Sequence, residues 1–102
     1  MPSINILFQQ QAADIIIDLL NKDLISIRKS VFDHYEDKRQ IFIYQLVSVT
    51  KAEEICILQQ IIYPNETKFA CIFFDGRKKD WDIDIIQHLI DVVTEKLQIK
   101  EI

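Results

Sequence analysis

The chain has 102 residues, of which 49% are hydrophobic and 27% are charged, so it has the composition of one folded domain and not of a disordered segment. Twelve Lys and Arg against sixteen Asp and Glu leave a net charge of -4, which disfavours nucleic acid as a partner because its phosphates would be repelled. No apolar run approaches the roughly 20 residues of a membrane span, and the first residues lack the features of a signal peptide, so we expect a cytoplasmic protein without a membrane partner.

The first predicted element is a helix from about residue 4 to residue 21. Its apolar residues recur at helical spacing, and Ser3 lies where a helix cap is expected. Because Ile4, Ile6 and Phe8 also alternate, a short strand is the alternative for the first residues. The helical stripe consists of Ile4, Leu7, Phe8, Ala12, Ile15, Ile16 and Leu19.

Two strands are predicted next, from about residue 24 to 35 and from 40 to 50. In the first strand apolar residues recur with period two but are interrupted by Lys29 and Asp33, which is typical of a half-buried or edge strand. In the second strand apolar residues occupy both parities, as expected of a more central strand that is covered on both faces. The charged residues 36–39 form the turn between the two strands.

The segment from residue 51 to 63 fits two structures. Thr50 and Glu53 have the capping-box spacing that would start a helix, whereas the apolar residues keep the alternation of a strand. We favour the strand, because the segment is rich in β-branched residues. In addition, the turn at residues 63–67 leads directly into an apolar strand at 68–74, with which the segment would form a hairpin.

Cys56 and Cys71 lie in apolar runs and are predicted to be buried, free thiols in a reducing compartment. If the hairpin turn is centred at Asn65, Cys56 pairs with Phe74 and the two thiols point to opposite faces of the sheet, which excludes a disulfide. A register shifted by one residue would place the thiols on the same face, though not directly opposite each other.

The last predicted element is a helix that starts near Asp80 or Asp82 and ends at about Gln98. A turn at Asp75 and Gly76 and a polar loop at residues 77–80 precede it. The chain is therefore predicted to be a single α+β domain over residues 1–102. It consists of an antiparallel four-stranded meander flanked by N- and C-terminal helices packed on one face, in the order α-β-β-β-β-α.

The side chains that could carry chemistry form no recognisable catalytic, cofactor-binding or metal-binding motif. Asp80, Asp82 and Asp84 have the spacing of a calcium loop, but Gly and Glu are missing at the positions where such a loop needs them, and acids at a helix start are favoured by the helix dipole. Neither His34 nor His88 has a second ligand at metal-site spacing. The single glycine cannot build a phosphate-binding loop. We expect no enzymatic activity, no cofactor and no metal.

The candidate partner-binding residues are aromatic and acidic side chains, most of them near the predicted turns. The aromatic residues would anchor a partner, and the acids would attract a basic protein. Trp81 has a second interpretation, as a hydrophobic staple that packs on the first turns of the last helix. The candidates are Asp33, Tyr35, Glu36, Asp37, Tyr63 and Trp81.

The leading hypothesis is a small acidic protein that neutralises or escorts a protein partner, in the manner of immunity proteins, inhibitors or secretion chaperones. The isoleucine-rich composition favours a bacterial or viral origin. A second hypothesis is a homo-oligomeric structural or regulatory domain, such as a homodimer, whose sheet edges or helices pair across a two-fold axis. A small enzyme that uses carboxylates and His34 is a third hypothesis, and a nucleic-acid binder is a fourth.

Overall fold

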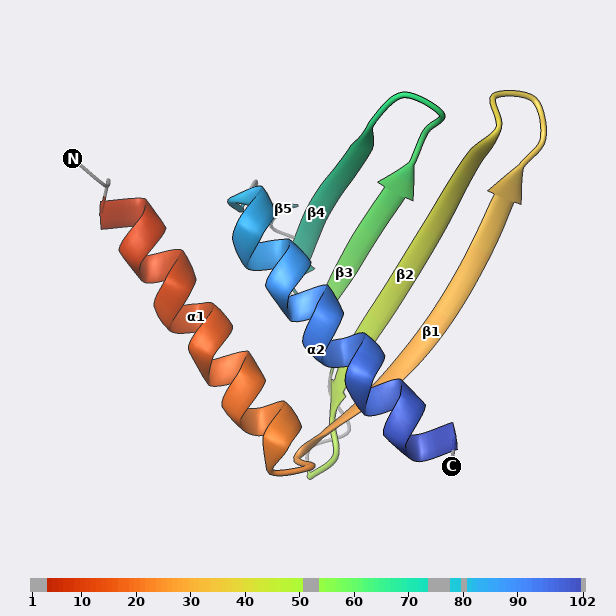
Figure 1. Ribbon diagram of the computed structural model, residues 1–102. Coiled ribbons are helices and arrows are strands. Elements are labelled where there is room, and N and C mark those ends of the chain that lie inside the picture. Colours follow the sequence, from red (N-terminus) through yellow and green to blue (C-terminus); the bar gives the residue numbers. More distant parts are fainter. Residues whose placement is uncertain (1–3, 51–53, 74–77, 80, 102) are drawn as a thin grey trace.

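The computed structural model describes residues 4–50, 54–73, 78–79 and 81–101, and it confirms the predicted α+β architecture (Figure 1). The meander and both terminal helices are present in the predicted order. The elements are α1 (Ile4–Asn21), β1 (Ile25–His34), β2 (Arg39–Ser48), β3 (Glu54–Ile62), β4 (Thr67–Phe73), β5 (Lys78–Lys79) and α2 (Ile83–Glu101).

The strands form one antiparallel sheet in the order β1-β2-β3-β4-β5, so β1 lies at an edge, as its interrupted alternation indicates. The preference for a strand over residues 51–63 is confirmed, since β3 occupies 54–62. Glu53, which belongs to the capping box of the helix alternative, lies outside the described residues. The loop predicted at 77–80 is partly wrong. Lys78 and Lys79 form β5, which pairs with Ile72 and Cys71 of β4.

The register of the β3–β4 hairpin differs by one residue from the prediction. Cys56 pairs with Phe73 and Leu58 pairs with Cys71, so the two cysteines are on the same face of the sheet and diagonal to each other. The loop between Ile62 and Thr67 therefore has four residues, and the backbone N–H of Tyr63 donates a hydrogen bond to the carbonyl oxygen of Glu66 over 2.8 Å. Because the side chains of a strand alternate between faces, this shift moves every β4 residue to the face opposite the predicted one.

Both helices lie on one side of the sheet, with α2 across the strands and α1 beside α2 (Figure 1). The helix predicted from residue 4 to 21 is confirmed, because α1 is helical from Ile4, so the alternative of a short strand does not hold. The proposed cap Ser3 lies outside the described residues. The start of α2 is capped by Asp82, whose Oδ1 accepts a hydrogen bond from the Asp84 backbone N–H over 2.8 Å. Neither helix is long and apolar enough, over its described residues, to cross a membrane.

The core lies between the helices and the sheet face to which the cysteines belong. It combines residues from both helices with residues from β1 to β4. Its buried members are Ala13, Ile16, Leu20, Ile25, Tyr44, Leu46, Cys56, Leu58, Cys71, Trp81, Ile85, Ile86, Leu89, Ile90 and Val93. The prediction that β2 is covered on both faces is wrong for the described elements, because both helices lie on one side of the sheet (Figure 1). On the face opposite the helices, Ile41 and Ile43 of β2 are half-buried.

Candidate interaction surface

The most exposed part of the sheet is the outer half of the β1–β2 hairpin, residues 28–38, here called the distal hairpin. Every residue in it is exposed, although three of its side chains are large and apolar or aromatic. Val31 is 46% exposed, Phe32 51% and Tyr35 91%. Large exposed aromatic side chains are frequent anchors in protein interfaces, so this surface is the strongest candidate for contact with a partner.

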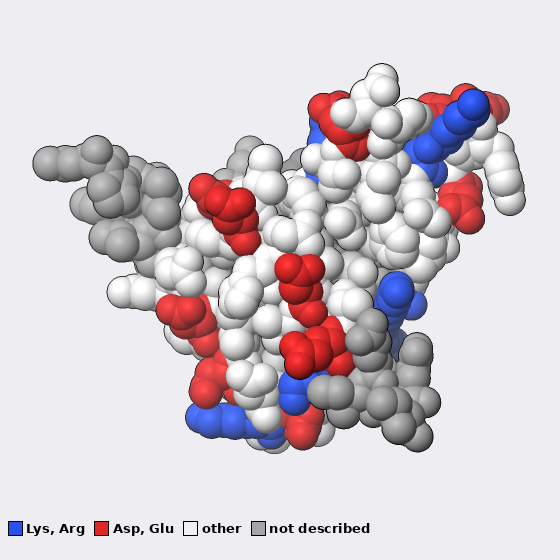
Figure 2. Space-filling view, viewed as in Figure 1, with Lys and Arg blue, Asp and Glu red and all other residues white. Residues whose placement is uncertain are grey.

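The tip of the distal hairpin carries charges of both signs. The side chain of Asp37 accepts a hydrogen bond from the Arg39 backbone N–H over 3.2 Å and forms an ion pair with the Arg39 guanidinium over 3.3 Å. Asp33 accepts a hydrogen bond from the Gln40 side-chain amide over 3.1 Å. Figure 2 shows acidic and basic side chains close together at the hairpin ends of the sheet and mainly acidic ones over the helices. The tip therefore carries the acids Asp33, Glu36 and Asp37 against the cations Lys38 and Arg39, and Arg39 partly neutralises Asp37.

Tyr63 lies at the same end of the sheet, because Gln40 pairs with Ile62 next to it. Its ring is half-buried beneath two cations: the Arg39 guanidinium is 6.0 Å and the Lys68 ammonium 5.6 Å from the ring centroid. These cation–π contacts hold the ring against the sheet, so Tyr63 is a less accessible anchor than Tyr35.

Trp81 is not part of this surface. Its side chain is 6% exposed, and its ring makes an edge-to-face contact with Phe73 at 5.3 Å between centroids. Its Nε1 has no hydrogen-bond partner among the described residues. Trp81 thus packs in the core against Phe73 of β4, directly before α2, and it offers little exposed surface to a partner.

The structure brings five of the six candidate residues together at one end of the sheet. Asp33, Tyr35, Glu36 and Asp37 come from the β1–β2 hairpin, and Tyr63 comes from the end of β3. The sequence did not single out Val31 and Phe32, because alternating apolar residues in a strand normally indicate a covered face. The interruption of that alternation by Lys29 and Asp33 was the available signal that this face is uncovered.

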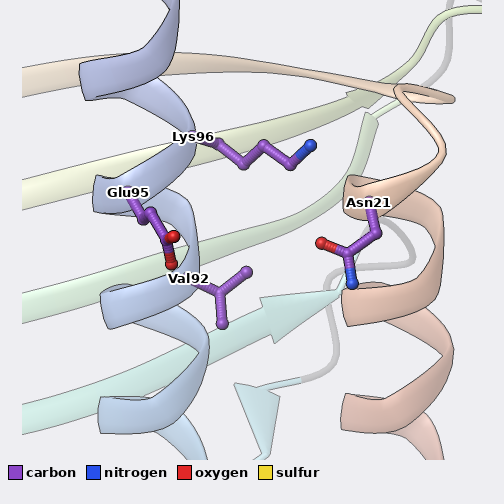
Figure 3. A pocket seen from close by; sticks show the side chains of 4 residues that line it. All are labelled: Asn21, Val92, Glu95 and Lys96. Atoms are coloured by element: carbon purple, nitrogen blue, oxygen red, sulfur yellow. The ribbon is translucent and has the colours of Figure 1, made fainter.

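A small pocket lies at the other end of the molecule, between the end of α1 and α2 (Figure 3). It is lined by Asn21, Val92, Glu95 and Lys96 and has a volume of about 130 Å³. The Lys96 ammonium forms an ion pair with Asp23 over 3.5 Å. Pockets for drug-sized ligands have volumes of roughly 300–1,000 Å³, so this pocket has room for little more than a few water molecules.

The two thiols are part of the core and face each other diagonally below the helices. Both are free and buried. The hydrogen bond to Cys71, together with burial, raises the pKa of Cys56 far above its ordinary value. A thiol that stays protonated is a poor nucleophile, so Cys56 has the properties of a structural residue.

Within the described part of the chain, no three His, Cys, Asp or Glu side chains are grouped so that they could hold a metal ion. Comparison of the chain with protein-family models, with curated proteins and with solved structures gave no match. The interpretation of the distal hairpin therefore depends on its own residues and their surroundings.

Proposed function

We propose that this chain is a small, non-enzymatic, cytoplasmic binding protein that neutralises or escorts a partner protein, and that the tip of the distal hairpin contacts this partner. The observation that carries the proposal is the exposure of Tyr35, at 91% of its surface, between acidic residues. A tyrosine has few rotatable bonds, so it can be buried in an interface at a low entropic cost.

The acids on either side of Tyr35 and the net charge of the chain favour a partner with a basic surface. Asp33 and Glu36 flank Tyr35, and the whole chain has a net charge of -4. Charges at the rim of an interface act mainly on the association rate and its salt dependence, whereas a central aromatic anchor acts on the dissociation rate. The acids are therefore expected to act on the association rate with the partner, and Tyr35 on the dissociation rate.

The partner can be sought with a photo-crosslinking amino acid in place of Tyr35, in cells that carry the gene. We expect a crosslinked product with one dominant protein. The matched control carries the same amino acid in place of Val49, which is 58% exposed and lies beside Leu24 at the other end of β1. Equal crosslinking from both positions, or none from the tip, would contradict the proposal.

With the partner identified, Tyr35→Ala is expected to weaken its binding by about tenfold to a hundredfold, mainly through faster dissociation. The double variant Glu36→Gln and Asp37→Asn is expected to slow association at low salt and to have a smaller effect at high salt. Surface plasmon resonance at two salt concentrations measures both rates. Binding that is insensitive to all three substitutions would show that another surface contacts the partner.

A further inference from the structure

The outer edge of β1 is an unpaired strand edge. All ten residues of β1 pair with β2 on one side, and the described part of the chain provides no strand on the other side. Figure 1 shows the upper half of β1 at the right-hand border of the sheet, with no element beside it. Such an edge presents a row of backbone donors and acceptors that another strand can use.

The exposed part of β1 has a defined centre. Ile25 is buried and the next two residues are half-buried, whereas the seven residues from Arg28 to His34 are all exposed. Val31 is the middle residue of this segment and is itself 46% exposed. A second strand that covered the whole exposed segment and no more would therefore be centred on Val31.

Charge complementarity selects the same centre for antiparallel pairing with a second copy. In a pair centred on Val31, Lys29 stands directly opposite Asp33 of the second copy, and the two-fold axis creates the reciprocal pair. Lys29 and Asp33 belong to the same face of β1, the face that carries Val31. Directly opposite residues have Cβ atoms about 4.5–5.5 Å apart, which is well within the reach of a lysine side chain.

Neighbouring registers lack this match. The helices of both copies lie on the same side of the joint sheet only if residues that stand opposite each other belong to the same face of β1. The centre of the strand pairing therefore always falls on a residue and can shift only by whole residues. A centre at Lys29 would oppose two lysines, and a centre at Asp33 would oppose two aspartates. A centre at Ser30 would place Lys29 opposite Val31, and one at Phe32 would place Asp33 opposite Val31.

Without an acid opposite it, Lys29 would disfavour pairing of β1 with a second strand. A lysine on an edge strand commonly prevents association, because a second strand would cover its charge without a partner. Its ammonium now lies 5.6 Å from the centroid of the Phe42 ring and 5.9 Å from that of Tyr44, on an exposed part of the sheet. Only a strand with an acid at the matching position can cover this lysine favourably, and β1 itself has such an acid.

We propose that two copies of this chain associate through antiparallel pairing of their β1 edges, centred on Val31 and held in register by reciprocal Lys29–Asp33 ion pairs. The result is one continuous sheet across a two-fold axis. Seven paired residues on each side give an interface below the roughly 1,200 Å² of standard complexes, so a reversible dimer with micromolar affinity is expected. The proposal extends the proposed function, because it names a second copy as a partner of the same hairpin.

The test is sedimentation equilibrium of the full chain and of two charge-reversal variants. We expect the wild-type chain to form dimers reversibly, and Lys29→Glu and Asp33→Lys each to weaken the dimer by about tenfold or more, because each places like charges opposite each other twice. The two substitutions move the net charge in opposite directions, so general charge repulsion cannot weaken both. Lys22→Glu, on an exposed side chain after α1, is the control and should leave the dimer unchanged.

An equimolar mixture of the two variants provides the decisive measurement. Lys29→Glu chains and Asp33→Lys chains again have opposite charges at both pairs, so the mixture should form a heterodimer with nearly wild-type affinity. Circular dichroism confirms that each variant is folded before the mixture is measured. A wild-type chain that stays monomeric up to several hundred micromolar, or a mixture that stays monomeric, would overturn the inference.

The two proposals can fail separately. A monomeric wild-type chain that still crosslinks to another protein from position 35 would refute the dimer and support the proposed function. A dimer that obeys the charge-reversal pattern, together with no crosslinked protein other than a second copy, would support the dimer and refute the role as a neutraliser or escort.

Discussion

Cys56 and Cys71 show how tertiary packing decides the properties of individual residues. The two thiols are buried on the same face of the sheet, and the hydrogen bond between them and their burial raise the pKa of Cys56. The thiolate is the reactive form of cysteine, so a raised pKa leaves little of it at neutral pH. The pair contributes to the core as two small apolar side chains.

We therefore expect both thiols to react slowly with a chromogenic thiol reagent in the native protein at mildly alkaline pH. In guanidinium chloride the same reagent should titrate two thiols rapidly, one for each cysteine of the chain. Absorbance stopped-flow measures both rates. Rapid labelling of the native protein would mean that the sheet below α2 opens easily.

Leu58 is the residue whose truncation should destabilise the core most clearly. It is fully buried, pairs with Tyr44 and Cys71 across the sheet, and belongs to the cluster that both helices cover. Leu58→Ala should lower the free energy of unfolding by about 2–5 kcal/mol, measured by urea denaturation. Ile15→Ala in α1 is the control, because Ile15 is 61% exposed; its effect should be within about 0.5 kcal/mol. Similar losses in both variants would contradict the assigned core.

At the scale of elements, the start of α2 is stabilised by a helix cap, which the acidic residues before the helix indicate in the sequence. Asp82 comes just before Ile83, the first residue of α2, and its carboxylate accepts the backbone N–H of Asp84. Acidic residues at this end also interact favourably with the helix dipole. The aspartates that have the spacing of a calcium loop thus have a structural role at Asp82 and Asp84, whereas Asp80 lies outside the described residues.

Asp82→Ala is expected to lower the free energy of unfolding by about 0.5–2 kcal/mol, because an N–H at the start of α2 loses its acceptor. Asp91→Ala is the matched control: Asp91 also accepts a hydrogen bond, from the Gln87 side chain over 2.8 Å, but on the exposed surface within the helix. Its loss should cost only about 0.2–0.5 kcal/mol. Equal losses in thermal or urea unfolding of the two variants would argue against a capping role.

At the scale of the whole molecule, the helices and the sheet share one core. The buried cluster contains residues of α1, α2 and the four long strands, together with Trp81. No subset of these elements has a separate set of buried residues among those described. A small domain with one core usually unfolds in a single cooperative transition.

Trp81 allows a direct test of this cooperativity, because it is the single tryptophan of the chain and lies in the core. Urea unfolding followed by tryptophan fluorescence and by far-ultraviolet circular dichroism should give the same midpoint. Fluorescence reports the packing around Trp81, whereas circular dichroism reports the helices and strands. Separate midpoints would show that the helices detach from the sheet before the sheet unfolds.

The sequence by itself determined the order and type of the long elements. Period-3.6 spacing places α1 at 4–21, the interrupted alternation predicts a half-buried or edge strand at β1, and β-branched content identifies β3 as a strand. These signals are local, because each depends on which side chains of one element must leave water. The role of Tyr35 as an aromatic anchor for a partner, proposed from the sequence, stays a prediction.

Only the tertiary structure decided the register of β3 and β4, the location of Trp81 and the open edge of β1. Changing the length of a hairpin loop by one residue changes the local free energy little, but it moves every side chain of one strand to the other face of the sheet. The register of β3 and β4 therefore depends on which pairing buries both Leu58 and Cys71 below the helices. Trp81 is buried because Phe73, eight positions earlier, lies against it. Burial, register and free edges are properties of contacts between distant segments, and a local pattern cannot determine them.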